Sequence, residues 1–263
     1  MGDEVRRAAR LLRRSPWTAV LTGAGVSTES GLPDFRSPGG LWAGVDPARV
    51  ASASAFARDP DAFYDFYQTR LGVLGTAAPN AAHRAIARLE ALGLVQVVIT
   101  QNVDGLHQQA GSRAVVEVHG NLREARCSAC GWIVPISEMS AQLERSARPR
   151  CARCGGLLRP NVVLFEEMLP PDSYDRAEEA CRRCAVLVVV GSSLEVYPVA
   201  ALPDLVRNRG AHLVVVNRDP TPYDGDADVV LRGAAGMILP GVVAAVEAEP
   251  AQQRGAAAER GAE

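Results

Sequence analysis

The six cysteines offer the clearest chemistry in the sequence, because all of them fall into Cys-x-x-Cys pairs. The pairs are Cys127 and Cys130, Cys151 and Cys154, and Cys181 and Cys184. Glycine directly follows the first two pairs, at Gly131 and Gly155, and twenty residues separate those pairs. Glycine permits the tight turn of a zinc knuckle, and four thiolates in two knuckles make a closed tetrahedral site without an open position. The sequence therefore predicts one structural zinc ion held by Cys127, Cys130, Cys151 and Cys154.

The third pair has a different context. No glycine follows Cys184, and the pair ends a helical pattern just before an apolar run. A spacing of three residues puts both thiols on one face of a helix. Packing in the core is the preferred interpretation of Cys181 and Cys184, and a redox pair or an additional metal ligand is the alternative.

A glycine turn, Gly23-Ala24-Gly25, follows the first apolar run of the chain. It resembles a phosphate-binding turn, but Thr28 stands where the dinucleotide fingerprint G-x-G-x-x-G has its third glycine. No Gly-Lys-Ser/Thr follows, which excludes a P-loop. Taken alone, the turn could also be an ordinary connection between a strand and a helix.

Histidine is the side chain whose pKa best suits a general base at neutral pH. We expect structural roles for three of the four histidines: His83 at a helix start, His107 in a helical context and His212 at a strand start. His119 is different because it follows an apolar run, precedes Gly120 and introduces the cysteine-rich segment. It is the candidate catalytic base.

Short, continuously apolar runs must position these groups. The runs are Ala19–Thr22, Val95–Thr100, Val115–Val118, Val186–Val190 and Leu213–Val216. Such runs are typical of parallel strands buried on both faces, and helical patterns such as 83–92 and 198–209 alternate with them. The sequence therefore predicts an α/β fold with a doubly wound, parallel, Rossmann-like sheet. Polar or small residues follow all five runs, at the carboxyl edge where such sheets bind ligands: Gly23, Gln101-Asn102, His119, Gly191-Ser192-Ser193 and Asn217.

Two segments interrupt the alternation. Residues 37–80 are rich in aromatic residues and proline and are expected to form a helical insertion, and residues 121–160 are expected to form a smaller zinc-binding domain. The large domain then comprises residues 1–36, 81–120 and 161–248. Its first helix should bury Val5, Ala9 and Leu12, and the tail 249–263 has the composition of a disordered segment.

The composition limits the classes of partner. The chain has 263 residues, 48% of them hydrophobic, and a net charge of −2. It has no lysine, so all 28 basic residues counted as Lys or Arg are arginine. It has neither the basic charge of a nucleic-acid-binding protein nor an apolar stretch for a membrane span or signal peptide. We expect a cytoplasmic, reducing location. The rival from another class is a zinc-ribbon nucleic-acid module, since Arg145, Arg148 and Arg150 lie between the knuckles.

Taken in order, the motifs from about Val20 to Gly236 resemble the sirtuin family of NAD-dependent protein-lysine deacylases. The motifs are "GAGVSTESGLPDFR", "TQNVDGLH", "VHG", the two zinc knuckles, "LRPNVVLF", "GSSLEVYP" and "VVN". The resemblance implies that backbone N–H groups of the glycine turn bind the phosphates of NAD beside a helix N-terminus. It also implies acylated lysine side chains of proteins as substrate partners, with no nucleic acid or membrane partner. We expect a monomer.

The resemblance assigns a set of positions to NAD. They are Gly23, Ala24, Gly25, Ser27, Thr28, Asp34, Phe35, Arg36, Gln101, Asn102, Asp104, Gly191, Ser192, Ser193, Asn217 and Ala235. Phe35 would shield the reacting carbon from water, and Arg36 would line the phosphate and nicotinamide side. Asn217 would hold the adenosine ribose, and Ala235 would lie near the adenine.

The implied reaction transfers the acyl group from lysine to ADP-ribose and releases nicotinamide. His119 would deprotonate a ribose hydroxyl, Asn102 would orient ribose and water together with Gln101, and Asp104 would bind the nicotinamide carboxamide. Mono-ADP-ribosyl transfer to a protein acceptor is the alternative reaction, because it uses the same bond cleavage.

The acyl group is suggested by Tyr67 and Arg70, which form a Tyr-x-x-Arg pair. This pair resembles the sirtuin branch that removes malonyl, succinyl and glutaryl groups, since arginine can bind a carboxylate bidentately while tyrosine adds a hydroxyl donor. Asp34 departs from that branch, which more usually has threonine there. We therefore expect deacetylase activity with possible desuccinylase or demalonylase activity, and an ordinary surface arginine beside a packed tyrosine is the alternative.

A second departure lies in "NVVLFEEMLP", where sirtuins usually have Phe-Gly-Glu and this chain has Phe165-Glu166-Glu167. In the family this segment pairs with the substrate peptide, and Val163 and Phe165 would line the acyl-lysine site. A positive φ would cost a glutamate about 1 kcal/mol or more, so we expect a backbone compatible with any residue. Glu166 would then favour basic residues in the peptide, or would simply point to solvent.

Overall fold

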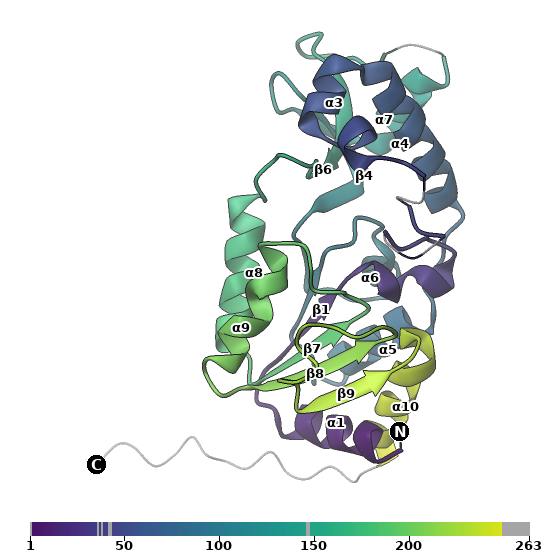
Figure 1. The fold of residues 1–263 in the computed structure, drawn as a ribbon. Coiled ribbons are helices and arrows are strands. Elements are labelled where there is room, and N and C mark those ends of the chain that lie inside the picture. The colour runs from purple at the N-terminus through teal and green to yellow at the C-terminus, as the bar shows by residue number, and fades with distance from the viewer. Residues whose placement is uncertain (1, 36, 38, 42–43, 146–147, 249–263) are drawn as a thin grey trace.

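The computed structural model describes residues 2–248 except 36, 38, 42–43 and 146–147, and it has two parts (Figure 1). The large part is a six-stranded parallel sheet between helices. The small part combines a three-stranded antiparallel sheet with the helices of the insertion. The tail predicted to be disordered lies outside the described residues.

The strands of the large sheet follow the order β3-β2-β1-β7-β8-β9, and every neighbouring pair is parallel. Their bounds are β1 Thr18–Thr22, β2 Val97–Thr100, β3 Val115–Glu117, β7 Val186–Val190, β8 His212–Asn217 and β9 Val229–Arg232. The five predicted strands and the doubly wound fold are confirmed. The sequence did not reveal β9, whose apolar run is only Val229-Val230-Leu231 and lies at the edge of the sheet.

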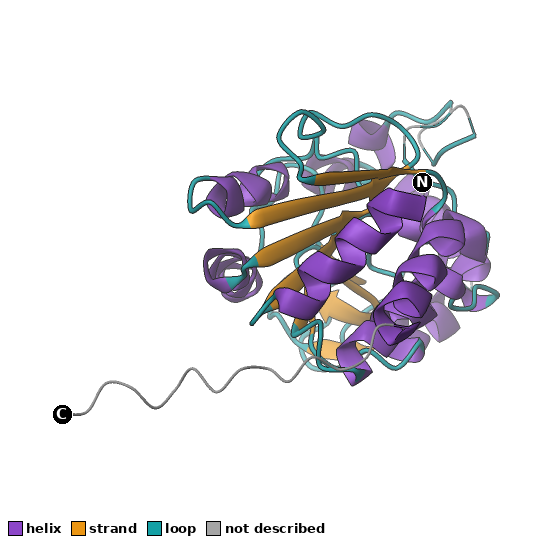
Figure 2. Cartoon of the chain, turned by 90° about the horizontal axis from the view of Figure 1, so that it is seen from below, coloured by secondary structure: helices purple, strands orange, loops and turns teal. Residues whose placement is uncertain are grey.

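Helices cover both faces of the sheet (Figure 2). One face packs against α1 (Gly2–Arg14), α5 (Ala81–Ala91) and α10 (Ala235–Ala248), and the other against α8 (Pro171–Arg183) and α9 (Leu202–Arg207). The predicted N-terminal helix is confirmed: Ala9 and Leu12 are buried, and Val5 packs at the margin of the same core. The pattern predicted as one helix over 198–209 is a 3₁₀ turn at Val199–Ala201 followed by α9.

The small part lies beyond the carboxyl edge of the large sheet, because the chain enters it after β1 and again after β3. Its strands are β4 (Gly120–Cys127), β5 (Ile133–Pro135) and β6 (Leu158–Val162), in the order β5-β4-β6. Helix α7 (Ile136–Leu143) packs beside them. The insertion is helical, as predicted, with α2 (Pro47–Val50), α3 (Ala53–Arg58) and α4 (Pro60–Gly75); α6 (Leu106–Gln109) belongs to the large part.

The insertion and the cysteine-rich segment share one core. Phe63, Tyr64 and Tyr67 of α4 are buried with Leu122, Val162 and Leu164. The Tyr64 hydroxyl donates a hydrogen bond of 2.8 Å to the Leu158 carbonyl. Arg148 donates to both carboxylate oxygens of Asp61 at 2.7 Å. These contacts join two segments that are separate in the sequence.

In the part of the chain that the structure describes, no helix combines the length and the apolar character that a membrane span requires.

Candidate functional site

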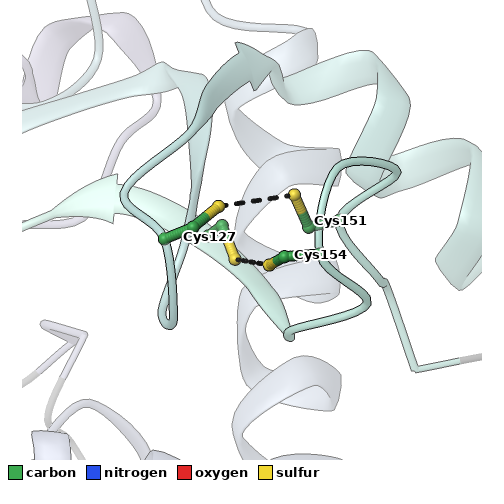
Figure 3. A group of neighbouring side chains, drawn as sticks. Cys127, Cys151 and Cys154 are labelled. Carbon is green, nitrogen blue, oxygen red and sulfur yellow. Dashed lines mark hydrogen bonds between the residues drawn. The ribbon is translucent and has the colours of Figure 1, made fainter.

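The four cysteines of the two knuckles lie face to face in the small part (Figure 3). Their four sulfur atoms all lie within 4.8 Å of one another, with 3.5 Å between Cys127 and Cys154 and 3.8 Å between Cys130 and Cys151. A tetrahedral zinc ion with Zn–S bonds of 2.3 Å requires sulfur separations of about 3.8 Å. The thiols therefore fit a structural zinc ion, as predicted.

The third cysteine pair is buried in the core of the large part. Cys181 lies in the last turn of α8 and Cys184 directly follows it. Burial raises the pKa of both thiols, that of Cys184 to about 11. Among the described residues, no cluster with metal-binding geometry includes either thiol. The structure favours the packing interpretation.

The glycine turn brings the ends of β1 and β7 into direct contact. Gly23 N–H donates to the Val190 carbonyl at 3.1 Å and Gly25 N–H to the Gly191 carbonyl at 2.8 Å. A Cβ atom on Gly25 would lie 2.8 Å from the Gly191 Cα. The glycines are therefore required by packing, and they also leave the backbone of the 3₁₀ turn Ala24–Val26 without side chains larger than alanine before Val26.

The Ser27 hydroxyl joins two of the predicted site residues. It donates a hydrogen bond of 2.7 Å to Asp104 Oδ2 and accepts one of 3.0 Å from Asn102 Nδ2. Asp104 Oδ1 accepts from the Leu106 N–H at the start of α6, at 2.9 Å. Ser27, Asn102 and Asp104 are all buried. These hydrogen bonds hold the three side chains in place. Thr28 bonds within its own turn, because its hydroxyl donates to the Gly25 carbonyl at 3.0 Å.

Two buried histidines lie next to this network. His83 Nε2 lies 3.4 Å from the Ser27 hydroxyl, and its ring contacts that of His107. His107 Nε2 lies 2.9 Å from the Thr22 hydroxyl. Burial lowers the pKa of His83 to about 4 and that of His107 to about 3. Both positions agree with structural roles, although no local sequence pattern indicated that the two rings reach the site. His212 pairs with Asp228 at the surface, as a structural residue would.

His119 has a defined tautomer. Its Nδ1 lies 2.9 Å from the Gln101 carbonyl oxygen, which can only accept a hydrogen bond. Nδ1 therefore carries the proton and Nε2 has a free lone pair. Burial lowers the pKa of His119, and the Gln101 carbonyl partly opposes that shift. The side chain of Gln101 donates in turn to the Ser192 hydroxyl at 2.9 Å, which joins the ends of β2 and β7.

The loop after the glycine turn is tied to its neighbours through Asp34. The Asp34 carboxylate accepts from the Ser37 N–H at 2.8 Å and lies 3.7 Å from the Arg218 guanidinium. Phe35 lies beneath the guanidinium of Arg70, 5.5 Å from the ring centroid. Arg36 lies outside the described residues.

The remaining predicted cofactor positions lie along the same edge. Ser193 is half-buried after β7, Asn217 ends β8 and donates to the Asp219 carbonyl at 2.8 Å, and Ala235 is buried at the start of α10. Two residues that were not predicted from the sequence also contact this edge. Glu29 accepts a hydrogen bond of 2.7 Å from the Gly236 N–H, and the Arg218 guanidinium lies 3.7 Å from Asp34. Their contacts are long-range, so no local spacing could have revealed them.

Tyr67 and Arg70 lie on α4, on the side of the small part that reaches Phe35. Tyr67 is buried against Phe63, with 4.6 Å between ring centroids, and burial raises its pKa to about 12. Arg70 is half-buried, and burial lowers its pKa. Among the described residues, no carboxylate lies within ion-pair distance of Arg70. Its guanidinium is therefore partly removed from water without the charge of a described carboxylate beside it.

The turn after β6 differs from the expectation. Glu166 has φ 75°, so the prediction of an unrestricted backbone is wrong. Its carboxylate accepts hydrogen bonds from the Ser54 N–H and hydroxyl, each at 2.9 Å, so the alternative of a side chain free in solvent is also wrong. Val163 is half-buried and its N–H donates to the His119 carbonyl at 2.9 Å, while Phe165 is 48% exposed.

The sequence is similar to proteins of known family. Residues 23–198 match the Sir2 family. The chain is 46% identical to NAD-dependent protein deacylase 2 of Archaeoglobus fulgidus over 248 residues, which cover 94% of this chain and 98% of that protein. It is 48% identical to an NAD-dependent protein deacetylase of Caldivirga maquilingensis over 235 residues, which cover 89% of this chain and 90% of the relative.

Solved structures agree with the fold. A Sir2 homologue in complex with NAD superimposes with a TM-score of 0.86 at 43% identity, covering 92% of this chain and 93% of the homologue. A Sir2 variant holding a deacetylated p53 peptide and 3′-O-acetyl-ADP-ribose superimposes with a TM-score of 0.85 at 39% identity, covering 90% of this chain and 96% of that chain.

Proposed function

We propose, from the premise that the chain belongs to the Sir2 family and is an NAD-dependent protein deacylase, that His119 is its general base. The observation that carries this assignment is the hydrogen bond between His119 Nδ1 and the Gln101 carbonyl, which leaves the Nε2 lone pair available. Burial keeps the ring neutral at pH 7, since it lowers the pKa of His119. A neutral imidazole can accept the proton of a ribose hydroxyl.

The carboxyl edge of the sheet has the donors that NAD needs. The Ala24 N–H at the start of the 3₁₀ turn would donate to a phosphate, since the N–H groups of Gly23, Gly25 and Val26 already donate to protein carbonyls. The hydroxyls of Ser192 and Ser193 would add donors to phosphate and ribose. Asn217 would hold the adenosine ribose, and Ala235 would contact the adenine. When bound, NAD supplies an electrophilic ribose carbon whose nicotinamide group can leave.

The buried network of Ser27, Asn102 and Asp104 would orient the reacting end of NAD. Asp104 would accept a hydrogen bond from the nicotinamide carboxamide, and Asn102 would hold a ribose hydroxyl or water. Because both side chains are already fixed by Ser27, little ordering remains to be done when NAD binds. Phe35 would exclude water from the reacting face, and Arg36 would lie near the phosphates. The acyl-lysine would enter between Val163 and Phe165.

We further propose that the enzyme removes dicarboxylic acyl groups as well as acetyl groups. Arg70 supports this because a half-buried guanidinium without a carboxylate partner favours an anionic ligand. Its stacking on Phe35 puts it beside the cofactor loop, where the distal end of an acyl chain could reach it. The Tyr67 hydroxyl would donate a second hydrogen bond to that carboxylate.

A paired mass-spectrometric assay tests both proposals. One peptide sequence carrying acetyl- or succinyl-lysine is incubated with NAD, and deacylated peptide and O-acyl-ADP-ribose are quantified. We expect turnover of both peptides, and we expect Arg70→Met to remove succinyl turnover while acetyl turnover persists. If the wild type turns over the acetyl peptide alone, the proposal that it removes dicarboxylic acyl groups is rejected. If His119→Ala leaves turnover unchanged, the role of His119 as general base is rejected.

We propose that the protein is cytoplasmic and monomeric. None of the six cysteines forms a disulfide, since four make up the metal-binding group and Cys181 and Cys184 are buried thiols. This usage suits a reducing compartment such as the cytoplasm. A monomer is the proposed state in solution, and light scattering coupled to size-exclusion chromatography would test it.

A further inference from the structure

The turn Leu164–Glu167 contains a backbone conformation that its sequence disfavours. Of the described residues that are not glycine, only Glu166 and Leu194 have positive φ, at 75° and 54°. In this region the Cβ atom crowds the following carbonyl, a contact that glycine avoids. A strained residue persists only where surrounding contacts hold it, so the contacts of Glu166 need an explanation.

One side of the turn is fixed to β6 through Glu167. The Glu167 carboxylate accepts from the Leu164 N–H at 3.0 Å and pairs with the buried Arg159 guanidinium at 2.5 Å. Arg159 also donates to the Val162 carbonyl at 2.9 Å. These contacts close the turn from within the small sheet.

The other side of the turn is fixed to the helical insertion through Phe165 and Glu166. The Phe165 N–H donates to the Ala51 carbonyl at 3.0 Å, and its carbonyl accepts from the Ala53 N–H at 3.1 Å. The Glu166 carboxylate then accepts from both the N–H and the hydroxyl of Ser54. We call this last pair the Glu166–Ser54 latch. It joins residues 112 positions apart in the sequence.

We infer that Glu166 is a positioning residue, whose latch on Ser54 holds the segment Val163–Phe165 in the shape that receives the substrate peptide. The inference rests on the proposed function, in which the acyl-lysine enters between Val163 and Phe165, and on the family resemblance, in which this segment pairs with the substrate peptide as an added strand. Glycine would adopt φ 75° without strain, but it has no carboxylate to reach Ser54. With glycine, the turn would form easily without further contacts. With Glu166, the turn depends on the tertiary contact to Ser54.

The functional consequence is a preformed edge for the peptide. A segment that is ordered before binding loses less conformational entropy when its ligand arrives, so it binds more tightly for the same contacts. The latch lies on the small part, away from the Ser27 network. Loss of the latch should therefore weaken binding of the peptide and leave the apparent affinity for NAD unchanged.

The test measures binding of a fluorescein-labelled acetyl-lysine peptide by anisotropy, which needs no turnover. The variants are Glu166→Ala, which loses the latch and keeps the strain, Glu166→Gly, which loses both, and Ser54→Ala, which loses one of two donors. We expect the peptide Kd to rise about tenfold in Glu166→Ala and in Glu166→Gly, which each lose two hydrogen bonds, and about threefold in Ser54→Ala, which loses one. Ser54→Ala should add nothing in the Glu166→Ala background.

Two controls separate the latch from charge and from folding. Glu179→Ala removes an exposed carboxylate from the neighbouring helix α8 and should leave the peptide Kd unchanged. Thermal melting and zinc content show whether each variant folds, and Glu166→Gly, which relieves the backbone strain, remains available if Glu166→Ala does not.

A peptide Kd within twofold of the wild type in folded Glu166→Ala would overturn the inference. An equal effect of Ser54→Ala in both backgrounds would do the same, because it would show that the two residues act independently. An error in the base or in the acyl preference would abolish or alter turnover without changing these binding results, so the two failures can be told apart.

Discussion

The cofactor side and the acyl side of the proposed site are built differently. On the cofactor side, polar groups at the strand ends are bound to one another: Ser27 holds Asn102 and Asp104, and Gln101 holds His119 and Ser192. On the acyl side, no hydrogen bond among the described residues joins Tyr67, Arg70 and Glu166 to one another. Arg70 lacks a carboxylate partner among the described residues, and Glu166 keeps an unfavourable backbone through a contact with the insertion.

The cofactor side carries out the same chemistry on every substrate, so its geometry must stay constant. The acyl side recognises the acyl group and the peptide, so its residues can vary. A preorganised network stabilises the reacting groups in one geometry and leaves little freedom for substitution. A side chain that projects from a helix, such as Arg70, can change with little effect on the fold. We therefore expect changes on the cofactor side to affect all substrates, and changes on the acyl side to affect only some of them.

The largest effect should follow from Cys127→Ala, which removes the support of one whole side. Loss of one thiolate should release zinc and destabilise the small part, because metal affinity there contributes to folding. Turnover of every acyl-peptide should be lost. Zinc content by mass spectrometry and thermal melting check the result, with the buried pair variant Cys181→Ser as the comparison that retains zinc. A folded Cys127→Ala protein with stoichiometric zinc would contradict the assignment.

His119→Ala should lower kcat by a factor of about 10²–10⁴, the range for a lost general base. The loss should be the same for acetyl and succinyl peptides, because His119 belongs to the cofactor side. Steady-state kinetics with both peptides measure it. A loss confined to one acyl group would break the distinction between the two sides.

Acid should destabilise the cofactor side through its buried histidines. The folded pKa values of His83 and His107 are about 4 and about 3, below the usual 6.5, so the unfolded chain binds more protons between these limits. The free energy of unfolding should then fall as pH drops from 6.5 towards 4, by up to about 1.4 kcal/mol per pH unit for each histidine.

NMR titration of the histidine ring protons tests this directly. The rings of His83 and His107 should stay neutral at pH 5.5. In a separate measurement, the fall of kcat/KM at acidic pH should begin below pH 6.5, because the pKa of His119 is also lowered. Protonation of either buried ring above pH 6 in the folded protein would refute the prediction. His212→Gln, at the surface, is the matched control.

Tyr67→Phe should sharpen the comparison on the acyl side. It removes one hydroxyl from a ring that otherwise keeps its packing against Phe63. We expect KM for a succinyl peptide to rise about fivefold, the effect of about one hydrogen bond, while acetyl turnover stays the same. Equal effects on both peptides would indicate a packing role for the hydroxyl instead.

The smallest expected effect concerns residues that flank the acyl-lysine. Glu166 is exposed at the turn, and peptides with basic flanking residues should bind about twofold more tightly than matched acidic peptides at low salt. Anisotropy at two salt concentrations checks this. Equal binding of the two peptides would show that the Glu166 carboxylate interacts with Ser54 and does not influence peptide binding through its charge.

The sequence predicted what local patterns determine. Continuous β-branched runs identified five strands, and the spacing of Cys127, Cys130, Cys151 and Cys154 identified the metal site. Local patterns could not identify the left-handed Glu166, because its conformation depends on Ser54, which is distant in the chain. For the same reason, the sequence did not reveal that Glu29 binds the start of α10 or that the insertion shares a core with the zinc-binding segment.

That shared core has a consequence for protein engineering. Residues 37–80 supply Phe63, Tyr64 and Tyr67, and residues 121–160 supply Leu122 and the Leu158 carbonyl that they contact. A chimera that grafts only one of these segments onto another Sir2 enzyme would pair two surfaces that were not selected together. Exchange of acyl specificity between relatives should therefore succeed when both segments are transplanted as one cassette.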